Sequence, residues 1–337
     1  MACTNYIPNF DRMLADCIQS HGQMAIFAFP GENIRHVVMP GRSECRFSIY
    51  PFGNAIGKKP ADFNSCLNGN QLIEPTPCSH DEYVTSLTQL IDELKADGGK
   101  TVFSRVRQIK SHISPAVVSK VYWDKHPDTF RYICVSPETG VWFGATPELI
   151  LRRRDDGLYE TMALAGTRRV TSAPWDVKNT DEHEFVIQHI ADVLNNCGLD
   201  YRIGDSHAIA FGDIEHLTHL IAFTPGNFGL SELALKLSPT PAICGYPVNL
   251  ALDRITHYEK SPRYYYGGEI MACVDRREEC YLNLRCAHAS LNDDGAWTYS
   301  IYCGGGITAM SEVENEWTET ALKSASLAEA ISQSEMM

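Results

Sequence analysis

Apolar residues recur at helical spacing near the end of the first hundred residues. Ser79 and Glu82 form a capping box, in which each side chain satisfies a backbone N–H group of the other. An apolar stripe follows at steps of three and four, and Gly98-Gly99 ends it. The stripe consists of Tyr83, Val84, Leu87, Leu90, Ile91 and Leu94. The pattern predicts one amphipathic helix between Ser79 and Gly98.

After this helix, short apolar runs alternate with turn residues. Turns such as Glu138-Thr139-Gly140 and Asp155-Asp156-Gly157 are short enough to connect antiparallel neighbours. Strands are predicted in TVFSRVRQI, TFRYICVS, VWFGA, LILRRR, LYETMAL, EIMACV, CYLNLRCAHASL and AWTYSIYC, and helices at about 181–196, 229–237, 247–258 and 311–332. Because strands come in blocks with helices between the blocks, the pattern favours a single domain of the α+β class.

Charge narrows the range of partners. A net charge of −13 argues against nucleic acid or an anionic membrane surface as the main partner. No segment approaches the roughly 18 continuous apolar residues of a membrane span. The 12 cysteines lack paired C-x-x-C spacing, and no charged-then-apolar leader opens the chain, which predicts reduced thiols in a cytoplasmic protein. We therefore expect a small-molecule partner, and either a monomer or a homodimer agrees with the sequence.

The last predicted helix carries candidate metal ligands. Ser311 and Glu314 predict a second capping box, and Glu316, Glu319 and Lys323 then fall at i, i+3 and i+7, on one helical face. Two carboxylates on one turn repel each other unless a cation lies between them, which favours an oxygen-seeking ion such as Mg²⁺. A solvated, charged helix face is the alternative, and it explains this spacing better when the spacing stands alone.

Two further segments could bind ions. The run Cys303-Gly304-Gly305-Gly306 ends a predicted strand, where bare backbone N–H groups can bind an anion, although a simple glycine turn explains it equally well. The cluster Asp181-Glu182-His183-Glu184 opens the helix predicted at 181, where carboxylates suit the positive end of the helix dipole. Together with Glu316 and Glu319 this cluster could complete an all-oxygen metal site.

Three charged residues lie at strand positions. Glu148 starts an apolar strand, where burial would raise its pKa and keep it protonated as a general acid; a surface position is the alternative. Lys100 begins another strand, where a partly desolvated lysine can lose its proton and act as a base, and Lys120 is its rival. Arg285 stands next to apolar Leu284, so a ligand carboxylate or an internal salt bridge would compensate its charge.

In this order along the chain, the segments resemble the chorismate-utilising enzymes: isochorismate synthase, salicylate synthase, anthranilate synthase component I and aminodeoxychorismate synthase. The matching segments run from about residue 98 to about 327: KTVFSR, GATPELILR, ALAGTRR, DEHEFV, EHLTHL, PTPAICGYP, the YYYGG run at 264–268, LNLRCA, CGGGI and NEWTETALK. So many segments in one order make a chance match very improbable. The resemblance implies one α+β domain of two facing antiparallel sheets flanked by helices. Residues 1–97 would be its variable part, and residues 98–330 the chorismate-binding region.

The resemblance also implies roles for individual residues. Lys100 is similar to the base that activates water, and Glu148 to the acid, while Lys120 lies outside the matching motif. Mg²⁺ would be held by Glu182, Glu319 and, directly or through water, Glu316. The substrate, chorismate, would contact Gly166, Thr167, His216, Ala242, Tyr266, Arg285, Gly304, Gly305 and Lys323.

Within this family the nucleophile decides the product. Ala165 occupies the position at which aminodeoxychorismate-forming enzymes carry a lysine, and anthranilate synthases generally lack a lysine matching Lys100. Water addition is therefore favoured, and we predict an isochorismate synthase that serves menaquinone or siderophore biosynthesis. Salicylate synthase and anthranilate synthase component I are the alternatives within the family. A non-catalytic chorismate-binding homologue and a metal-independent two-carboxylate glycoside hydrolase are the rivals outside this prediction.

Overall fold

The computed structural model describes residues 10–20, 22–41, 44–53, 59–67, 73–170, 173–211 and 214–336. Within these ranges the side chains of Phe10, Asp11, Lys178, Glu182 and Phe211 lie outside the description. The helices are α1 (Phe10–Gln19), α2 (His80–Asp97), α3 (Pro115–Lys125), α4 (Val177–Asn196), α5 (Leu230–Leu237), α6 (Val248–Tyr258) and α7 (Val313–Glu335). None of these helices has the length and apolar character needed to cross a lipid bilayer.

Two antiparallel sheets are built from these described ranges. The first sheet has the order β13 (Gly245–Tyr246), β5 (Lys100–Ser111), β17 (Trp297–Ile307), β16 (Cys286–Leu291), β7 (Gly140–Thr146), β6 (Phe130–Ser136), β1 (Met24–Ala28) and β2 (His36–Val38). The second has the order β10 (Tyr201–Ile203), β12 (Ile214–Phe223), β9 (Tyr159–Arg169), β8 (Leu149–Arg153), β15 (Arg277–Leu282), β14 (Glu269–Val274), β3 (Arg46–Ile49) and β4 (Ala61–Asp62), and β11 (His207–Phe211) pairs with β12.

The two sheets pack face to face around an aromatic core. Phe27 of β1 stacks on Phe47 of β3 with ring centroids 5.7 Å apart, and Phe130 of β6 stacks on Tyr281 of β15 at 4.3 Å. Each pair joins one sheet to the other, and such offset aromatic contacts add to the free energy of burial. The α+β fold of two facing antiparallel sheets flanked by helices is confirmed.

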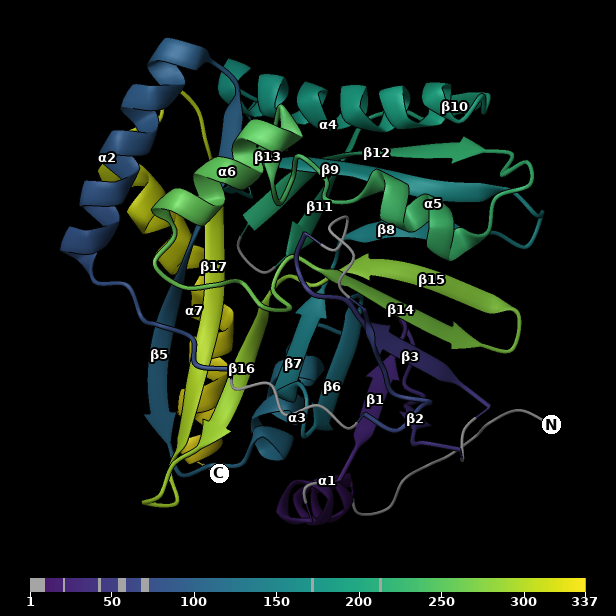
Figure 1. The fold of residues 1–337 in the computed structure, drawn as a ribbon, viewed down its shortest axis with the longest axis vertical. Coiled ribbons are helices and arrows are strands. Elements are labelled where there is room, and N and C mark those ends of the chain that lie inside the picture. The colour runs from purple at the N-terminus through teal and green to yellow at the C-terminus, as the bar shows by residue number, and fades with distance from the viewer. Residues whose placement is uncertain are drawn as a thin grey trace.

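Helices cover the outer faces of both sheets (Figure 1). Leu14 of α1, Trp123 of α3 and Ile331 of α7 share one apolar cluster with Phe143 and Ile301 of the first sheet. Helix α4 lies along β9 and β12 of the second sheet, and α5 packs on β8 and β15. The two sheets therefore enclose the main core, and each has a helical layer outside it.

The first predicted helix is confirmed in detail, whereas the predicted start of the last helix is wrong. The Ser79–Glu82 capping box is present, and Gly98 ends α2. Helix α7 instead begins after Glu312, and the side chain of Ser311 donates a hydrogen bond to Glu316 Oε1 at 2.7 Å. Side-chain spacing identified the helix, but the Ser311 hydroxyl that the capping box required bonds instead to Glu316, five residues further along the chain.

Three other local predictions are also wrong. Helix α4 begins at Val177 after its N-cap Asp176, so the acidic cluster at 181–184 lies in the second turn and does not cap the helix. The segment CYLNLRCAHASL forms two strands, because the backbone of Arg285 has φ +51° between β15 and β16. The three glycines at 304–306 lie inside β17, paired with β5, and not in a turn.

Much of the structure before residue 68 was not predicted. Strands β1 and β2 belong to the first sheet, and β3 and β4 to the second. These strands have two to five residues each, and β1 pairs with β6, which lies about a hundred positions further along the chain. Helix α3 and strands β10 to β12 were missed as well. Short elements with distant partners leave little periodic pattern in the sequence.

Candidate active site

One cavity brings together the predicted acid and all nine predicted substrate-binding residues. It lies where β5 and β17 of the first sheet approach β9 and β12 of the second. Its predicted lining residues are Glu148, Gly166, Thr167, His216, Ala242, Tyr266, Arg285, Gly304, Gly305 and Lys323. Ala165, Cys303 and Gly306, which sequence analysis singled out for other reasons, also line the cavity, and so do residues that it did not identify: Val102, Pro147, Leu164, Ile243, Leu284 and Tyr302. The mixture of apolar walls with a few convergent polar groups is typical of small-molecule sites.

Glu148 is the acidic group of this cavity. It lies in the connection between β7 and β8, is only 4% exposed, and its backbone N–H donates to Thr146 Oγ1 at 3.3 Å. Burial raises the pKa of Glu148 to about 8, although the charges of Lys100, Arg285 and Lys323 act to lower it. The carboxyl group is therefore mostly protonated at neutral pH, as a general acid must be.

Lys100 lies within electrostatic reach of Glu148. It is the first residue of β5 and is fully buried, and its charge lowers the pKa of Glu148 and, behind burial and His219, that of His183. Val102 lines the cavity, and residues two apart on a strand share one face, so Lys100 lies on the cavity side of β5. Neither Lys100 nor its rival Lys120 is among the residues that line the cavity, and Lys120 is exposed on α3.

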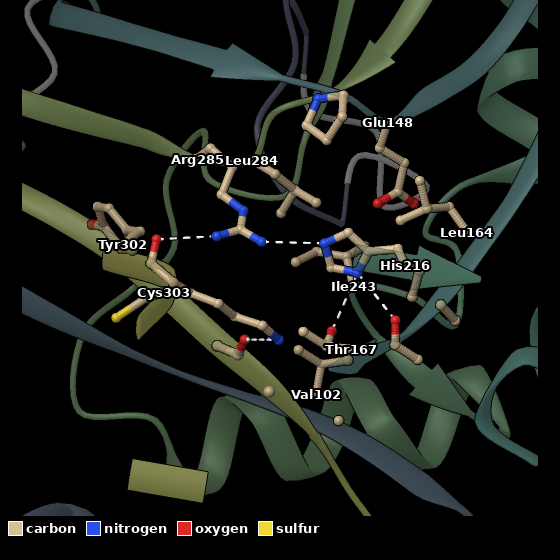
Figure 2. Close-up of a pocket in the computed structure, with 18 of the residues that line it drawn as sticks. Val102, Glu148, Leu164, Thr167, His216, Ile243, Leu284, Arg285, Tyr302 and Cys303 are labelled. Carbon is tan, nitrogen blue, oxygen red and sulfur yellow. Dashed lines mark hydrogen bonds between the residues drawn. The ribbon is translucent and has the colours of Figure 1, made fainter. Parts of the chain in front are cut away.

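Arg285 and His216 are joined by a hydrogen bond (Figure 2). His216 Nδ1 lies 3.0 Å from the Gly166 carbonyl oxygen, which can only accept, so we assign the proton to Nδ1. Nε2 then accepts from Arg285 Nη2 at 3.3 Å, while Nη1 donates to the Lys323 carbonyl oxygen at 3.1 Å. Burial lowers the pKa of His216 to about 3, and the charges of Arg285 and Lys323 lower it further. The imidazole is therefore neutral and holds the guanidinium by accepting from it.

The protein also fixes the backbone of Arg285. Its carbonyl oxygen accepts a hydrogen bond from Tyr122 Oη at 3.3 Å, and its positive φ turns the chain between two strands. Arg285 is partly buried, and burial lowers the pKa of its guanidinium from the ordinary value. In Figure 2 the Arg285 guanidinium and the Glu148 carboxyl both point toward the space beside His216. A cation and a protonated acid thus face one small cavity.

Two carboxylates of α7, those of Glu316 and Glu319, converge on Gly305 of β17. Glu316 is buried, and Glu319 is half-buried with its carboxylate 2.6 Å from Lys323 Nζ. A Cβ on Gly305 would lie 3.1 Å from Glu316 Oε2 and 3.5 Å from Glu319 Oε1, so both carboxylates converge on this glycine. Two hard oxygen donors on one helical turn fit Mg²⁺.

The third predicted metal ligand cannot be compared with these two. Glu182 lies in α4, but its side chain is outside the described residues. Among the side chains that are described, no group of three or more His, Cys, Asp and Glu residues could hold a metal ion. The metal site therefore stays a prediction: Glu316 and Glu319 converge on Gly305, and neither is among the residues that line the cavity.

A residue that the sequence did not reveal contacts the cavity wall from behind. Asn179 of α4 accepts a hydrogen bond from the backbone N–H of Thr167 through its side-chain oxygen, at 2.8 Å. In the sequence it is one polar residue among several near a predicted helix start, and no periodic pattern distinguishes it. Only the pairing of α4 with β9 brings it to the site.

Comparisons with known proteins identify relatives of this chain. Isochorismate synthase EntC of Escherichia coli (strain K12) is 28% identical over 244 residues, which cover 66% of this chain and 60% of that protein. Isochorismate synthase MenF of the same strain is 27% identical over 261 residues, covering 72% and 58%. The chain thus spans about 60% of the length of these curated relatives.

Solved structures show the same fold. The structure of MenF, the menaquinone-specific isochorismate synthase from Escherichia coli, aligns with a TM-score of 0.77 at 17% identity and covers 98% of this chain and 93% of that one. A putative 2,3-dihydroxybenzoate-specific isochorismate synthase, DhbC from Bacillus anthracis, gives 0.73 at 20%, covering 95% and 100%. The family model described as chorismate binding enzyme matches residues 55–332, most of the sequence. The chain is therefore a member of the chorismate-binding enzyme family.

Proposed function

We propose that this chain converts chorismate to isochorismate by adding water at C2 and releasing the hydroxyl group at C4. The observation that carries the proposal is the Glu148 carboxyl, which is buried in the cavity with a pKa of about 8 and faces the same space as Arg285. A carboxylic acid that keeps its proton at neutral pH can protonate a leaving hydroxyl group. The names of the relatives EntC and MenF point to the same reaction.

Arg285 and Lys323 supply the positive charge that a dicarboxylate substrate requires. The Arg285 guanidinium donates to a main-chain carbonyl and to a neutral imidazole, and the Glu319 carboxylate acts on it through space. A planar guanidinium can bind a carboxylate through two parallel hydrogen bonds. Lys323 lines the cavity, and its Nζ donates to the Gly304 carbonyl at 3.0 Å and to the Glu319 carboxylate at 2.6 Å, which would place an ammonium group beside a bound substrate. We assign substrate carboxylate binding to these two residues.

Lys100 and Glu148 divide the proton transfers. Lys100 takes the proton from the water that attacks C2, and Glu148 gives its proton to the C4 oxygen that leaves as water. Neither residue can replace the other, because the bond to C2 forms while the bond to C4 breaks. Because both side chains are buried, bulk water cannot exchange protons with them during the reaction.

Mg²⁺ would be held by Glu316 and Glu319 together with Glu182. When bound, it would stabilise negative charge on the ring carboxylate as water adds to the neighbouring carbon. Ser311 and Lys323 orient the two carboxylates of α7 by donating hydrogen bonds to them. This arrangement gives the carboxylates a fixed geometry before the ion arrives.

The choice of water as nucleophile agrees with Ala165, which lines the cavity where a lysine would supply a nitrogen nucleophile. We propose that the isochorismate serves menaquinone or siderophore biosynthesis, in keeping with the name of the MenF relative.

The direct test is product analysis. Purified protein is incubated with chorismate and Mg²⁺, with and without EDTA and with ammonium in a parallel sample, and isochorismate, salicylate and anthranilate are separated by chromatography. We expect isochorismate alone, and only when Mg²⁺ is present. Salicylate would mean that pyruvate is also eliminated, and anthranilate would mean that ammonia is the nucleophile. Chorismate binding without turnover would support a non-catalytic homologue, and EDTA-insensitive hydrolysis of glycosides would overturn the proposal.

A further inference from the structure

Asn179 uses its whole side-chain amide to join helix α4 to the cavity wall. Its Oδ1 accepts from the backbone N–H of Thr167 at 2.8 Å, and its Nδ2 donates to Asp176 Oδ1 at 2.9 Å and Oδ2 at 2.8 Å. Its own backbone N–H donates to Asp176 Oδ1 at 2.8 Å. The residue is 8% exposed. A buried amide with both its oxygen and its nitrogen in use is held in one orientation.

The neighbouring glycine fits closely against this asparagine. Gly166 has φ +74°, and a Cβ there would lie 3.1 Å from the Asn179 carbonyl oxygen and 3.2 Å from its Cβ. The other side of the same dipeptide faces the cavity, because the Gly166 carbonyl accepts from His216 and the Thr167 hydroxyl lies 3.2 Å from the same nitrogen. Asn179 therefore supports the wall from behind, while His216 contacts it from the front.

The contacts continue from this wall to the cation of the site. His216 bridges the Gly166–Thr167 wall and Arg285, because its Nδ1 donates to the Gly166 carbonyl and its Nε2 accepts from the guanidinium. A displacement of the wall would move the imidazole, and the imidazole would move the guanidinium that faces the substrate. Every contact in this series is a hydrogen bond between described residues.

Ala173 and Trp175, which precede α4, are held by contacts that do not involve Asn179. Arg168 Nε donates to Glu215 Oε1 at 2.7 Å and its Nη1 donates to the Ala173 carbonyl at 2.6 Å. Its guanidinium also lies 3.8 Å from the centroid of the Trp175 ring. These contacts tie the residues just before Asp176 to β9 and β12, so the first turn of α4 keeps its place beside Thr167.

Helix capping alone does not account for these contacts. The Asp176 carboxylate caps α4 by accepting the backbone N–H of Asn179, and that bond needs no asparagine side chain. The bond from Thr167 leaves the helix and ends on the cavity wall. We infer that Asn179 is a positioning residue for substrate carboxylate binding, acting through Thr167 and His216 on Arg285. The inference rests on the proposed function, because chorismate is its ligand.

The first test compares Asn179→Ala with Thr180→Ala. Thr180 stands next in the same turn, is exposed, and donates only to the Asp176 carbonyl, so its replacement leaves the wall intact. We expect Asn179→Ala to raise both KM and the calorimetric Kd for chorismate about tenfold, with kcat within about threefold of wild type. Thr180→Ala should match wild type in all three. A purely structural role would instead lower Tm and the active fraction while KM and Kd stay unchanged, and that result overturns the inference.

The second test is a rescue. Asn179→Asp places a second carboxylate against Asp176 and should weaken chorismate binding as Asn179→Ala does. In the double variant Asp176→Asn with Asn179→Asp, the amide and the carboxylate exchange places, and Kd should return to near the wild-type value. Equal weakening in the single and double variants would contradict the inference. A wild-type protein that does not bind chorismate would overturn the proposed function itself, whereas normal binding by Asn179→Ala would overturn only the positioning role.

Discussion

Two arginines, Arg263 and Arg285, lie close to the same cavity but have partners of different charge. Arg263 is buried and forms a salt bridge with buried Glu259, and its other donors go to main-chain carbonyls. Although burial alone lowers it, Glu259 raises the pKa of Arg263 above its ordinary value. Arg285 donates to a carbonyl and to neutral His216, and burial lowers its pKa.

The difference separates a structural charge from one that serves a ligand. The charge of Arg263 is cancelled inside the protein, so it adds nothing to the attraction of an anion. Arg285 lies beside Glu148, which is mostly protonated at neutral pH, and the carboxylate that acts on Arg285 through space, Glu319, is itself paired with Lys323. A bound carboxylate can pair with the Arg285 guanidinium through two parallel hydrogen bonds, whereas the Arg263 guanidinium already pairs with both oxygens of Glu259.

The largest expected effect is on turnover. Lys100→Ala and Glu148→Gln should each lower kcat about a thousandfold, because each removes one proton transfer. Circular dichroism and Tm should show that the fold is intact. Turnover near the wild-type level in either variant would contradict the assignment of that residue as base or acid. It would also contradict the view that Arg285, unlike Arg263, belongs to a catalytic site.

Glu259→Gln should act on stability instead. It leaves the charge of Arg263 buried without its carboxylate, so the free energy of unfolding should fall by about 3 kcal/mol in urea titrations at pH 7. The matched control is Glu232→Gln, which removes an exposed ion pair with Lys236 and should change stability by less than about 0.5 kcal/mol. If folded Glu259→Gln lost as much kcat as Glu148→Gln, the Arg263–Glu259 pair would serve catalysis as well as stability, and its contrast with Arg285 would be wrong.

The protonation of Glu148 can be measured without any assay of activity. Its pKa is raised from 4.5 to about 8 in the folded protein, so the folded state binds the proton more tightly than the unfolded state. This stabilisation is fully present below about pH 4.5 and is lost as the pH rises through about 8. Relative to Glu148→Gln, wild type should therefore lose a few kcal/mol of unfolding free energy between pH 5 and pH 9. Parallel stability curves for the two proteins would show that Glu148 is ionised throughout.

The smallest expected effect concerns the shape of the cation. Arg285→Lys keeps the positive charge but loses the planar fork that binds a carboxylate with two hydrogen bonds. KM for chorismate should rise about tenfold, with a smaller change in kcat and little change in Tm. An unchanged KM would mean that a point charge suffices there and that the orientation imposed by His216 is unimportant.

Local patterns in the sequence predicted more of the fold than of the site's chemistry. The stripe of α2 and most strands after residue 98 could be identified because neighbouring residues determine their periodicity. The start of α4, the break at Arg285 and the glycines within β17 were predicted wrongly. The glycines lie in a strand because β17 pairs with the distant β5, whereas α4 starts at a local N-cap, Asp176, that the apolar spacing did not identify. The resemblance supplied the candidate site residues. Glu148 and the nine substrate-binding candidates line one cavity, whereas Lys100, Glu316 and Glu319 are not among its lining residues.

The order of amino acids alone established the α+β class and the set of residues that could perform chemistry, since both follow from residue type and spacing. The tertiary structure decided which of these groups carry charge. Glu148 keeps its proton only because the two sheets bury it, and His216 is neutral only because it is buried between a carbonyl and Arg285. Protonation and hydrogen-bond direction depend on solvent exclusion and on partners far away in the chain, and no local pattern records either.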